Sequence, residues 1–226
     1  MVAFWVLIVS VIFALTDWYA VEKKIFWLRI TAKPLVIITL GVWLLMQPIA
    51  LPELLWFLLA LVFSLLGDVW LLAPPRFFMA GLASFLLTHV CYVIGLNLEL
   101  PPVTWPVQSL AGGFIILGIL VYPVLFRGVR NQPGARKLQG ATLIYYVVLS
   151  VMAFSATCTL IRPEWERLAA VSVAIGGLFF FFSDFLLAYD RFINSVKHGR
   201  LAVHVTYHFG QFGLIVGIVW QLLAHK

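Results

Sequence analysis

The chain has 226 residues, of which 63% are hydrophobic and only 11% are charged, far below the roughly 25% charged residues of a soluble domain. Such a composition excludes a water-soluble globular protein and indicates one that crosses a membrane several times. The net charge of +6 comes from basic residues in short loops without interleaved aromatic side chains, so we expect no nucleic-acid binding.

Eight apolar segments, separated by proline, glycine and charged residues, are each about as long as a membrane-spanning helix. In chain order, we expect spans at residues 3–21, 34–48, 53–73, 77–97, 107–126, 139–161, 168–189 and 201–223. Helices are the expected form, because the alternating pattern of a membrane β-barrel is absent. No linker is long enough to separate two domains. We therefore predict one all-α transmembrane bundle over residues 1–226, in which the first span is retained rather than cleaved as a signal peptide.

Lysine and arginine residues are distributed unevenly between the two sides of the predicted bundle. The loops after spans one, three, five and seven hold 12 of the 15, and the opposite side holds Arg162, Arg167 and Lys226. Because cytoplasmic loops are enriched in these residues, we predict that both termini lie outside the cytoplasm. Short loops and the lack of an organellar signal favour a bacterial inner membrane.

Polar side chains inside the spans gather at one depth, in the half next to the basic loops. Asp68 and Asp184 each lie five residues before the end of their span, which at 1.5 Å per residue places both about 7 to 8 Å inside. The eighth span adds four residues on one helical face, namely His204, Tyr207, His208 and Gln211. A carboxylate in hydrocarbon is costly, so a cluster of this kind indicates a functional site, whereas a single such residue is explained equally well by headgroup water.

Several short motifs occur together in these spans. They are Lys33-Pro34, "FSLLGD", "GGLFFFFSDFLLA" and "TYHFGQ", and the fourth span carries a histidine with a tyrosine one turn later. The motif residues are Lys33, Ser64, Asp68, His89, Tyr92, Ser183, Asp184, Tyr207 and Gln211. Taken jointly, and in this order, they resemble the YhhN family of multi-pass membrane proteins, the lysoplasmalogenase family.

The resemblance implies a membrane hydrolase that cleaves the vinyl-ether bond of lysoplasmalogens to a fatty aldehyde and a glycerophospho-ethanolamine or glycerophospho-choline. We expect an alkenyl lysophospholipid as the substrate, membrane lipids as the other partners, and no cofactor. Hydrolysis of an alkenyl ether begins with protonation of its β-carbon, and water then captures the oxocarbenium-like cation. The reaction therefore needs a proton donor and a negative charge nearby.

Two carboxyl groups in a low-dielectric pocket supply both, because repulsion and desolvation keep one protonated while the other stays ionised. We hypothesise that Asp68 and Asp184 are this catalytic pair, facing each other, with neither assigned as the acid. The predicted substrate-binding residues, which orient water or the glycerol hydroxyl or hold the phosphate, are Lys33, Ser64, His89, Tyr92, Ser183, Tyr207 and Gln211. The aliphatic chain is expected among the phenylalanine-rich walls of spans four and seven.

Two alternatives use the same side chains differently. His204 and His208, four residues apart on a helix, could hold zinc together with Asp68 or Asp184. A proton-coupled lipid or small-solute carrier would instead use the two aspartates as protonation sites. The likeness of "GDVWLLA" to "SDFLLA" in two spans of the same direction hints at the internal duplication that carriers often have.

Overall fold

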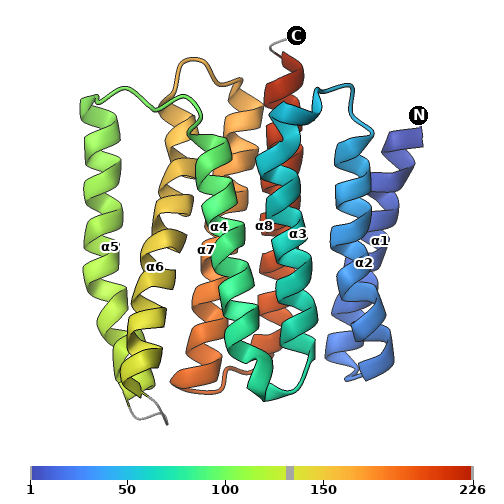
Figure 1. Cartoon of the computed structure of the whole chain (residues 1–226), viewed down its shortest axis with the longest axis vertical. Helices are drawn as coiled ribbons and strands as arrows, with labels where there is room; N and C mark the ends of the chain where they lie inside the picture. Colours follow the sequence, from blue (N-terminus) through green and yellow to red (C-terminus); the bar gives the residue numbers. More distant parts are fainter. Residues whose placement is uncertain (1, 131–134, 225–226) are drawn as a thin grey trace.

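The computed structural model describes residues 2–130 and 135–224, and eight long helices make up a single bundle in this part of the chain (Figure 1). They are α1 (Val2–Glu22), α2 (Phe26–Leu45), α3 (Leu51–Leu72), α4 (Phe78–Leu96), α5 (Trp105–Arg130), α6 (Ala135–Cys158), α7 (Arg167–Phe192) and α8 (Gly199–Ala224). Two 3-10 turns, η1 (Pro75–Phe77) and η2 (Thr159–Ile161), precede α4 and follow α6. Eight segments of the described residues are long and apolar enough to cross a membrane, which confirms the predicted all-α class and the number of spans.

The second span begins earlier than the sequence predicts. We placed its start at Pro34, because proline lacks an N–H and is disfavoured inside helices. In the structure α2 begins at Phe26, and Pro34 lies within it. Membrane helices tolerate an internal proline, since neighbouring groups satisfy the freed carbonyl. As a result Arg29 and Lys33, which we counted as loop residues, lie inside the helix, and Lys33 is buried with 6% exposure.

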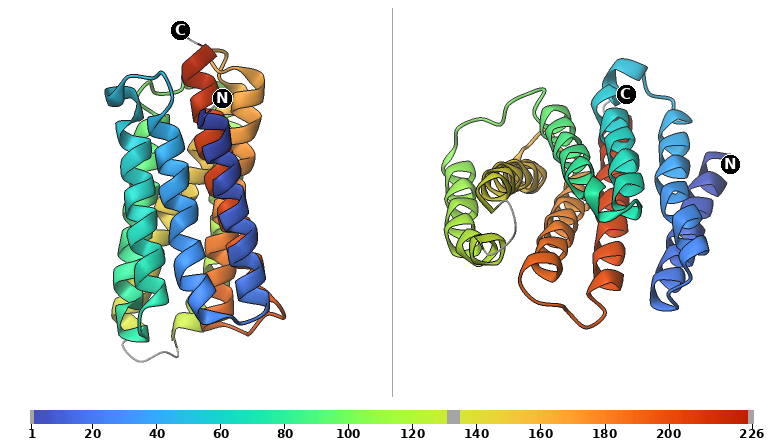
Figure 2. Two further views of the ribbon diagram at one scale, coloured as in Figure 1. Left: turned by 90° about the vertical axis from the view of Figure 1, so that its right-hand side faces the viewer. Right: turned by 60° about the horizontal axis from the view of Figure 1, so that its bottom comes forward.

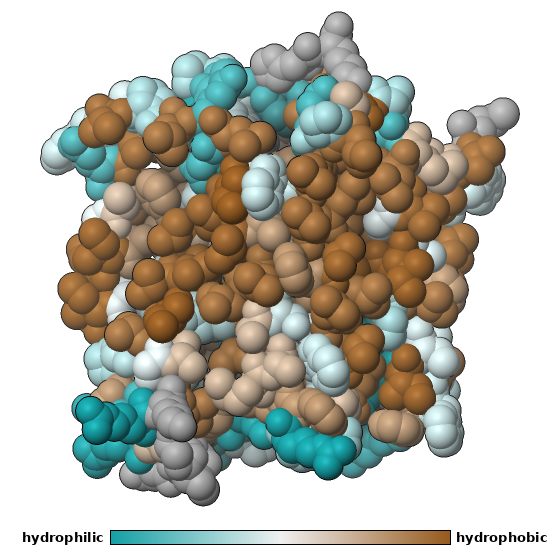
Figure 3. Space-filling model, in the orientation of Figure 1, coloured by the Kyte–Doolittle hydropathy of each residue, from teal (hydrophilic) through white to brown (hydrophobic). Residues whose placement is uncertain are grey.

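Successive helices run in opposite directions, so the chain begins and ends on the same side of the bundle. Helices α1, α3, α5 and α7 finish at the lower end in Figure 1, where α2, α4, α6 and α8 begin, and we call this the basic end. Val2 and Ala224 lie at the opposite end, and the two further views agree (Figure 2). A broad apolar belt separates hydrophilic rims at both ends (Figure 3). That the basic end faces the cytoplasm stays a prediction from the charge distribution.

The closest helix pair is α7 with α8, where glycines bring the two backbones into contact. A Cβ at Gly176 would overlap the backbone nitrogen of Leu214, and one at Gly213 would lie 2.7 Å from the Cα of Gly176. The Ser172 hydroxyl donates to the Gly213 carbonyl across the same interface at 2.9 Å. Small residues of this kind let membrane helices approach closely. The contact fixes the functional side chains of α7 against those of α8.

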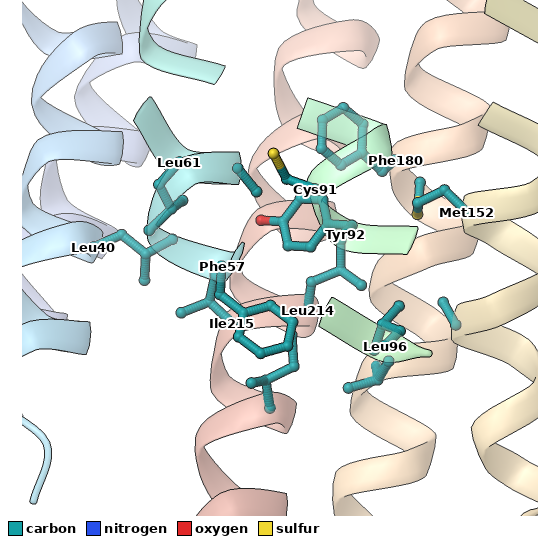
Figure 4. Packing of buried hydrophobic residues seen from close by; sticks show 14 of the residues in the cluster. Leu40, Phe57, Leu61, Cys91, Tyr92, Leu96, Met152, Phe180, Leu214 and Ile215 are labelled. Atoms are coloured by element: carbon teal, nitrogen blue, oxygen red, sulfur yellow. The ribbon is translucent and has the colours of Figure 1, made fainter. Parts of the chain in front are cut away.

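The hydrophobic core is built from α2, α3, α4, α6, α7 and α8, and the close view shows how Phe57, Tyr92, Phe180, Leu214 and Ile215 pack within it (Figure 4). Helix α5 contributes little to it, and most of its large apolar side chains are exposed. Exposed apolar side chains on an outer helix are those expected to face lipid. The polar side chains of the site therefore lie directly on the best-packed part of the bundle.

Candidate functional site

A cavity of about 880 Å³ opens between the helices at the basic end. Its walls come from α2, the end of α3, the start of α4, α7 and the start of α8. The polar and charged side chains that line it are Arg29, Lys33, Ser183, Asp184, Asp190, Arg191, Arg200, His204 and Tyr207. A hollow of this size is typical of a small-molecule site. Basic side chains outnumber carboxylates on its walls, which suits an anionic ligand.

Asp184 lines this cavity, and one of its two carboxyl oxygens is hydrogen-bonded to protein side chains. The Tyr145 hydroxyl donates to Oδ2, and the Nε2 of His89 lies 2.8 Å from the same oxygen. The Nδ1 of His89 is buried without a partner, which fits a neutral ring that carries its proton on Nε2, because a charged ring would bury an unpaired N–H. Among the described residues Oδ1 of Asp184 receives no hydrogen bond. It is thus the oxygen left for a ligand.

Asp68 belongs to a different set of contacts. Its Oδ1 forms an ion pair with Lys33 Nζ at 2.8 Å, and the Tyr207 hydroxyl donates to Oδ2 at 3.0 Å. Lys33 Nζ also lies 5.4 Å from the centre of the Tyr207 ring. Asp68 is fully buried, whereas Lys33 and Tyr207 reach the cavity wall. The carboxylate therefore acts on the cavity through these two neighbours.

The two aspartates of the expected catalytic pair belong to separate sets of contacts. Within the described residues, no hydrogen bond or ion pair joins Asp68 to Asp184. The Phe180 ring lies between their partners, with its centre 5.3 Å from that of Tyr207 and 4.7 Å from that of His89. Counting residues from helix ends places both carboxyls at a similar height, but it leaves the rotation of each helix undetermined.

Three of the predicted substrate-binding residues lie behind the cavity wall. The Gln211 amide donates to the Ser64 hydroxyl at 2.7 Å and accepts from Tyr92 at 2.6 Å, and Ser64 also contacts Thr88 at 3.2 Å. All four side chains are completely buried. A closed network of this kind holds α3, α4 and α8 together.

Of the remaining predicted residues, Ser183 lines the cavity and His89 lies behind its wall. Ser183 lines the cavity, and its hydroxyl donates to the carbonyl of Val203 at 3.0 Å. His89 is completely buried and reaches the cavity only through Asp184. The sequence prediction did not include Arg29, Arg200 or Tyr145 in the site. Tyr145 lies in the sixth span at the depth of the two aspartates, and this position was the sequence signal that could have placed it at the site.

The two histidines of α8 have partners other than those of the zinc interpretation. His204 Nδ1 lies 2.6 Å from Oδ2 of Asp17, and the indole N–H of Trp18 donates to Nδ1 of His208 at 2.9 Å. The described residues contain no group of three or more His, Cys, Asp or Glu side chains that could hold a metal ion. Neither histidine is bonded to Asp68 or Asp184 in the described contacts, so these contacts do not form the arrangement of the zinc alternative.

A second, apolar hollow of about 40 Å³ adjoins Asp184 from the other side. It lies between α4, α5, α6 and α7, and its walls include Tyr145 and Tyr146. Phe78, Asp184, Leu187 and Phe192 belong to the walls of both hollows. Asp184 therefore stands where a polar cavity meets an apolar one.

Comparison with known proteins relates the chain to one family, the YhhN family. The YhhN family profile matches residues 28–218, which run from α2 to α8. The human lysoplasmalogenase TMEM86A is 29% identical over 157 residues, 67% of this chain and 60% of the human protein. The lysoplasmalogenase of Mycobacterium tuberculosis is 30% identical over 169 residues, 71% of this chain and 58% of that protein. The chain thus spans about 60% of the length of these relatives. No solved structure matches it.

Proposed function

The chain belongs to the YhhN family, and from this membership and the geometry of the cavity we propose that it is a membrane-embedded lysoplasmalogenase. The reaction is hydrolysis of the vinyl-ether bond of a lysoplasmalogen to a fatty aldehyde and a glycerophospho-ethanolamine or glycerophospho-choline. The observation that carries the proposal is the position of Asp184 at the junction of the polar and apolar hollows. In a lysolipid the scissile ether likewise joins a polar headgroup to an apolar chain.

The walls of the two hollows support one orientation of the substrate. Arg29, Lys33 and Arg200 line the polar cavity and suit the phosphate, which arginine and lysine bind through charge-assisted hydrogen bonds. Phe78 and Leu187 line both hollows and suit the first methylene groups of the alkenyl chain. With the two parts so placed, the vinyl ether lies beside Asp184.

Asp184 then serves as the proton donor. Because Tyr145 and His89 hold Oδ2, the proton is carried on Oδ1 and transferred to the β-carbon of the alkenyl chain. The carboxylate left behind stabilises the cation that forms next to it. Asp68 acts as a positioning residue, since its contacts orient Lys33 and Tyr207 at the cavity wall.

The first prediction is that the purified protein in detergent releases aldehyde from an alkenyl lysophospholipid, and no fatty acid from the ester counterpart. Asp184→Asn keeps the size of the side chain but removes the transferable proton, so aldehyde release falls by about 10²- to 10⁴-fold. Aldehyde and fatty acid are measured in the same reaction. Wild-type protein that releases no aldehyde, or full activity of Asp184→Asn, would contradict the proposal.

The carrier alternative is separated from the hydrolase by the same measurement. Transport requires two compartments, which detergent micelles do not provide, whereas hydrolysis proceeds in a micelle. Aldehyde release in detergent therefore belongs to the hydrolase alone. A protein without this activity that instead moved protons and lysolipid across a sealed vesicle would support the carrier.

A further inference from the structure

A second acid–base arrangement lies on the cavity wall contributed by α8. His204 lines the cavity and is 7% exposed, and its Nδ1 lies 2.6 Å from Oδ2 of Asp17. Asp17 itself is completely buried. It comes from α1, which lies entirely before the residues that the family profile matches. Carboxylate and imidazole, 187 positions apart in the chain, thus form a dyad that the catalytic proposal above does not use.

The dyad leaves one nitrogen of the ring available. A carboxylate that accepts the Nδ1–H of a neutral imidazole fixes the tautomer and leaves the lone pair on Nε2. Among the described residues, Nε2 of His204 has no protein partner, and it is absent from the buried polar atoms that lack a hydrogen bond. Because the His204 ring borders the cavity, its Nε2 is available to water or to a ligand.

His208 shows by contrast what a purely structural histidine looks like in the same helix. It lies one turn beyond His204, is completely buried and is not part of the cavity wall. Its Nδ1 accepts from Trp18, and its Nε2 is enclosed without a partner. The two histidines share residue type, helix and face, and they differ in access to the cavity.

The segments of α7 and α8 that carry Asp184 and His204 contact each other. The hydroxyl of Ser183, the residue before Asp184, donates at 3.0 Å to the carbonyl of Val203, the residue before His204. Both acid–base residues line the same cavity. A substrate carbon beside Asp184 therefore lies in the cavity that His204 also borders.

We propose that His204 is the group that activates the attacking water in this cavity, and that Asp17 is the residue that orients it. The inference rests on the proposed lysoplasmalogenase activity. It assigns the activation of the attacking water to a pair of side chains separate from Asp184 and its partners.

The proton transfers balance with these two groups. Asp184 Oδ1 gives its proton to the β-carbon, where the double-bond electrons form the new C–H bond and leave a cation shared by the α-carbon and the ether oxygen. A water oxygen bonds to the α-carbon while Nε2 of His204 takes one of its protons, and a neutral hemiacetal results. The carbon–oxygen bond to glycerol then breaks. The imidazolium gives its proton to the departing oxygen, and Asp184 takes the hemiacetal hydroxyl proton as the aldehyde forms.

This cycle consumes one water and returns both side chains to their starting states. It requires no oxidant, reductant or further reactant. It also divides the two proton acceptances between two groups, because His204 takes the proton of the attacking water and Asp184 stays ionised to take the hemiacetal proton.

The test uses the purified protein in detergent and an alkenyl lysophospholipid with a phosphoethanolamine headgroup, with aldehyde release as the readout. His204→Gln is expected to lower kcat by about 10²- to 10⁴-fold with little change in KM, because the ring contacts water rather than the headgroup. His204→Ala is expected to recover part of its activity when free imidazole is added. His208→Gln and His208→Ala are the matched controls; they are expected to keep activity of the wild-type order and to show no response to imidazole.

Asp17 is tested through its dependence on His204. Asp17→Asn alone is expected to lower kcat and leave KM nearly unchanged. When it is added to His204→Gln, kcat is expected to fall no further, because residues that act as a unit are not additive. A residue that merely supported the fold would lower activity in both backgrounds.

The outcomes distinguish this inference from the proposed function. Wild-type protein without aldehyde release overturns both. Active wild-type protein combined with a His204→Gln variant of undiminished kcat, or with a His204→Ala variant that imidazole does not rescue, overturns the role of His204 alone. Elution of each variant as a single peak in size-exclusion chromatography controls for misfolding.

Discussion

Lys33 and Asp68 form a buried ion pair at the site, with Asp68 completely buried and the Lys33 residue 6% exposed. Removing one partner of such a pair leaves the other charge in a poor solvent, which is usually more damaging than removing both. The loss is moderated here, because Lys33 borders the cavity and is accessible to water. The pair therefore contributes to stability as well as to the position of Lys33.

We predict that Asp68→Asn destabilises the protein by about 3 kcal/mol, the low end of the range for a broken buried pair. The double variant Lys33→Met, Asp68→Asn removes both charges and is expected to regain most of the lost stability while remaining inactive. Thermal unfolding in detergent measures the first effect and aldehyde release the second.

Asp184→Asn is the matched control for this experiment, since Asp184 has no lysine or arginine partner among the described ion pairs. It should shift the unfolding midpoint less than Asp68→Asn. An Asp68→Asn protein as stable as the wild type would show that the ion pair does not hold α2 against α3.

Single residues also show how far spacing along the sequence predicts a site. Asp184, Lys33 and Tyr207 were expected at the site and do line the cavity. Ser64 and Gln211 were expected as ligand contacts, but they bond to each other inside the bundle. Whether a polar residue lines the cavity or bonds to another residue inside the bundle depends on the rotation of its helix, and helix packing sets that rotation.

Among the helices, α7 and α8 set the geometry of the site because glycine allows their backbones to touch. We predict that Gly176→Ala lowers the stability by about 1–3 kcal/mol, the usual penalty for overpacking, because its Cβ would overlap the backbone of Leu214. Activity should fall with it, since the same interface places Ser183 against Val203.

Gly112→Ala on α5 is the matched control for helix propensity. A Cβ at Gly112 would meet nothing within 4 Å, so this change is expected to be neutral or slightly stabilising. Thermal unfolding of both variants separates the steric effect from the backbone effect. Equal midpoints for the two variants would argue against close α7–α8 packing.

Helix α2 illustrates how a local signal fails in a membrane. Proline marks a helix start in many sequences, yet Pro34 lies within α2. The consequence is functional, because the extra turns bring Arg29 and Lys33 from the expected loop onto the cavity wall.

For the whole molecule, the unequal distribution of basic residues predicts that the basic end, and with it the cavity, faces the cytoplasm. A reporter enzyme that is active only outside the cytoplasm should be active when fused to the C-terminus, because both ends of the chain lie opposite the basic end. The same reporter inserted after Asn194, between α7 and α8, should be inactive. The reverse pattern would place the cavity on the outer face.

Composition and hydropathy by themselves determined the membrane class, the eight spans and the depth at which polar side chains gather, because these depend on residue type and position along one helix axis. The motifs also sufficed to indicate the family. Only the tertiary structure decided which partner each carboxyl has. His89 meets Asp184 across 95 positions and Asp17 meets His204 across 187, and such contacts depend on the rotation and neighbours of each helix. The rotation and the neighbours of a helix are set by packing between distant segments, so a local sequence pattern does not predict them.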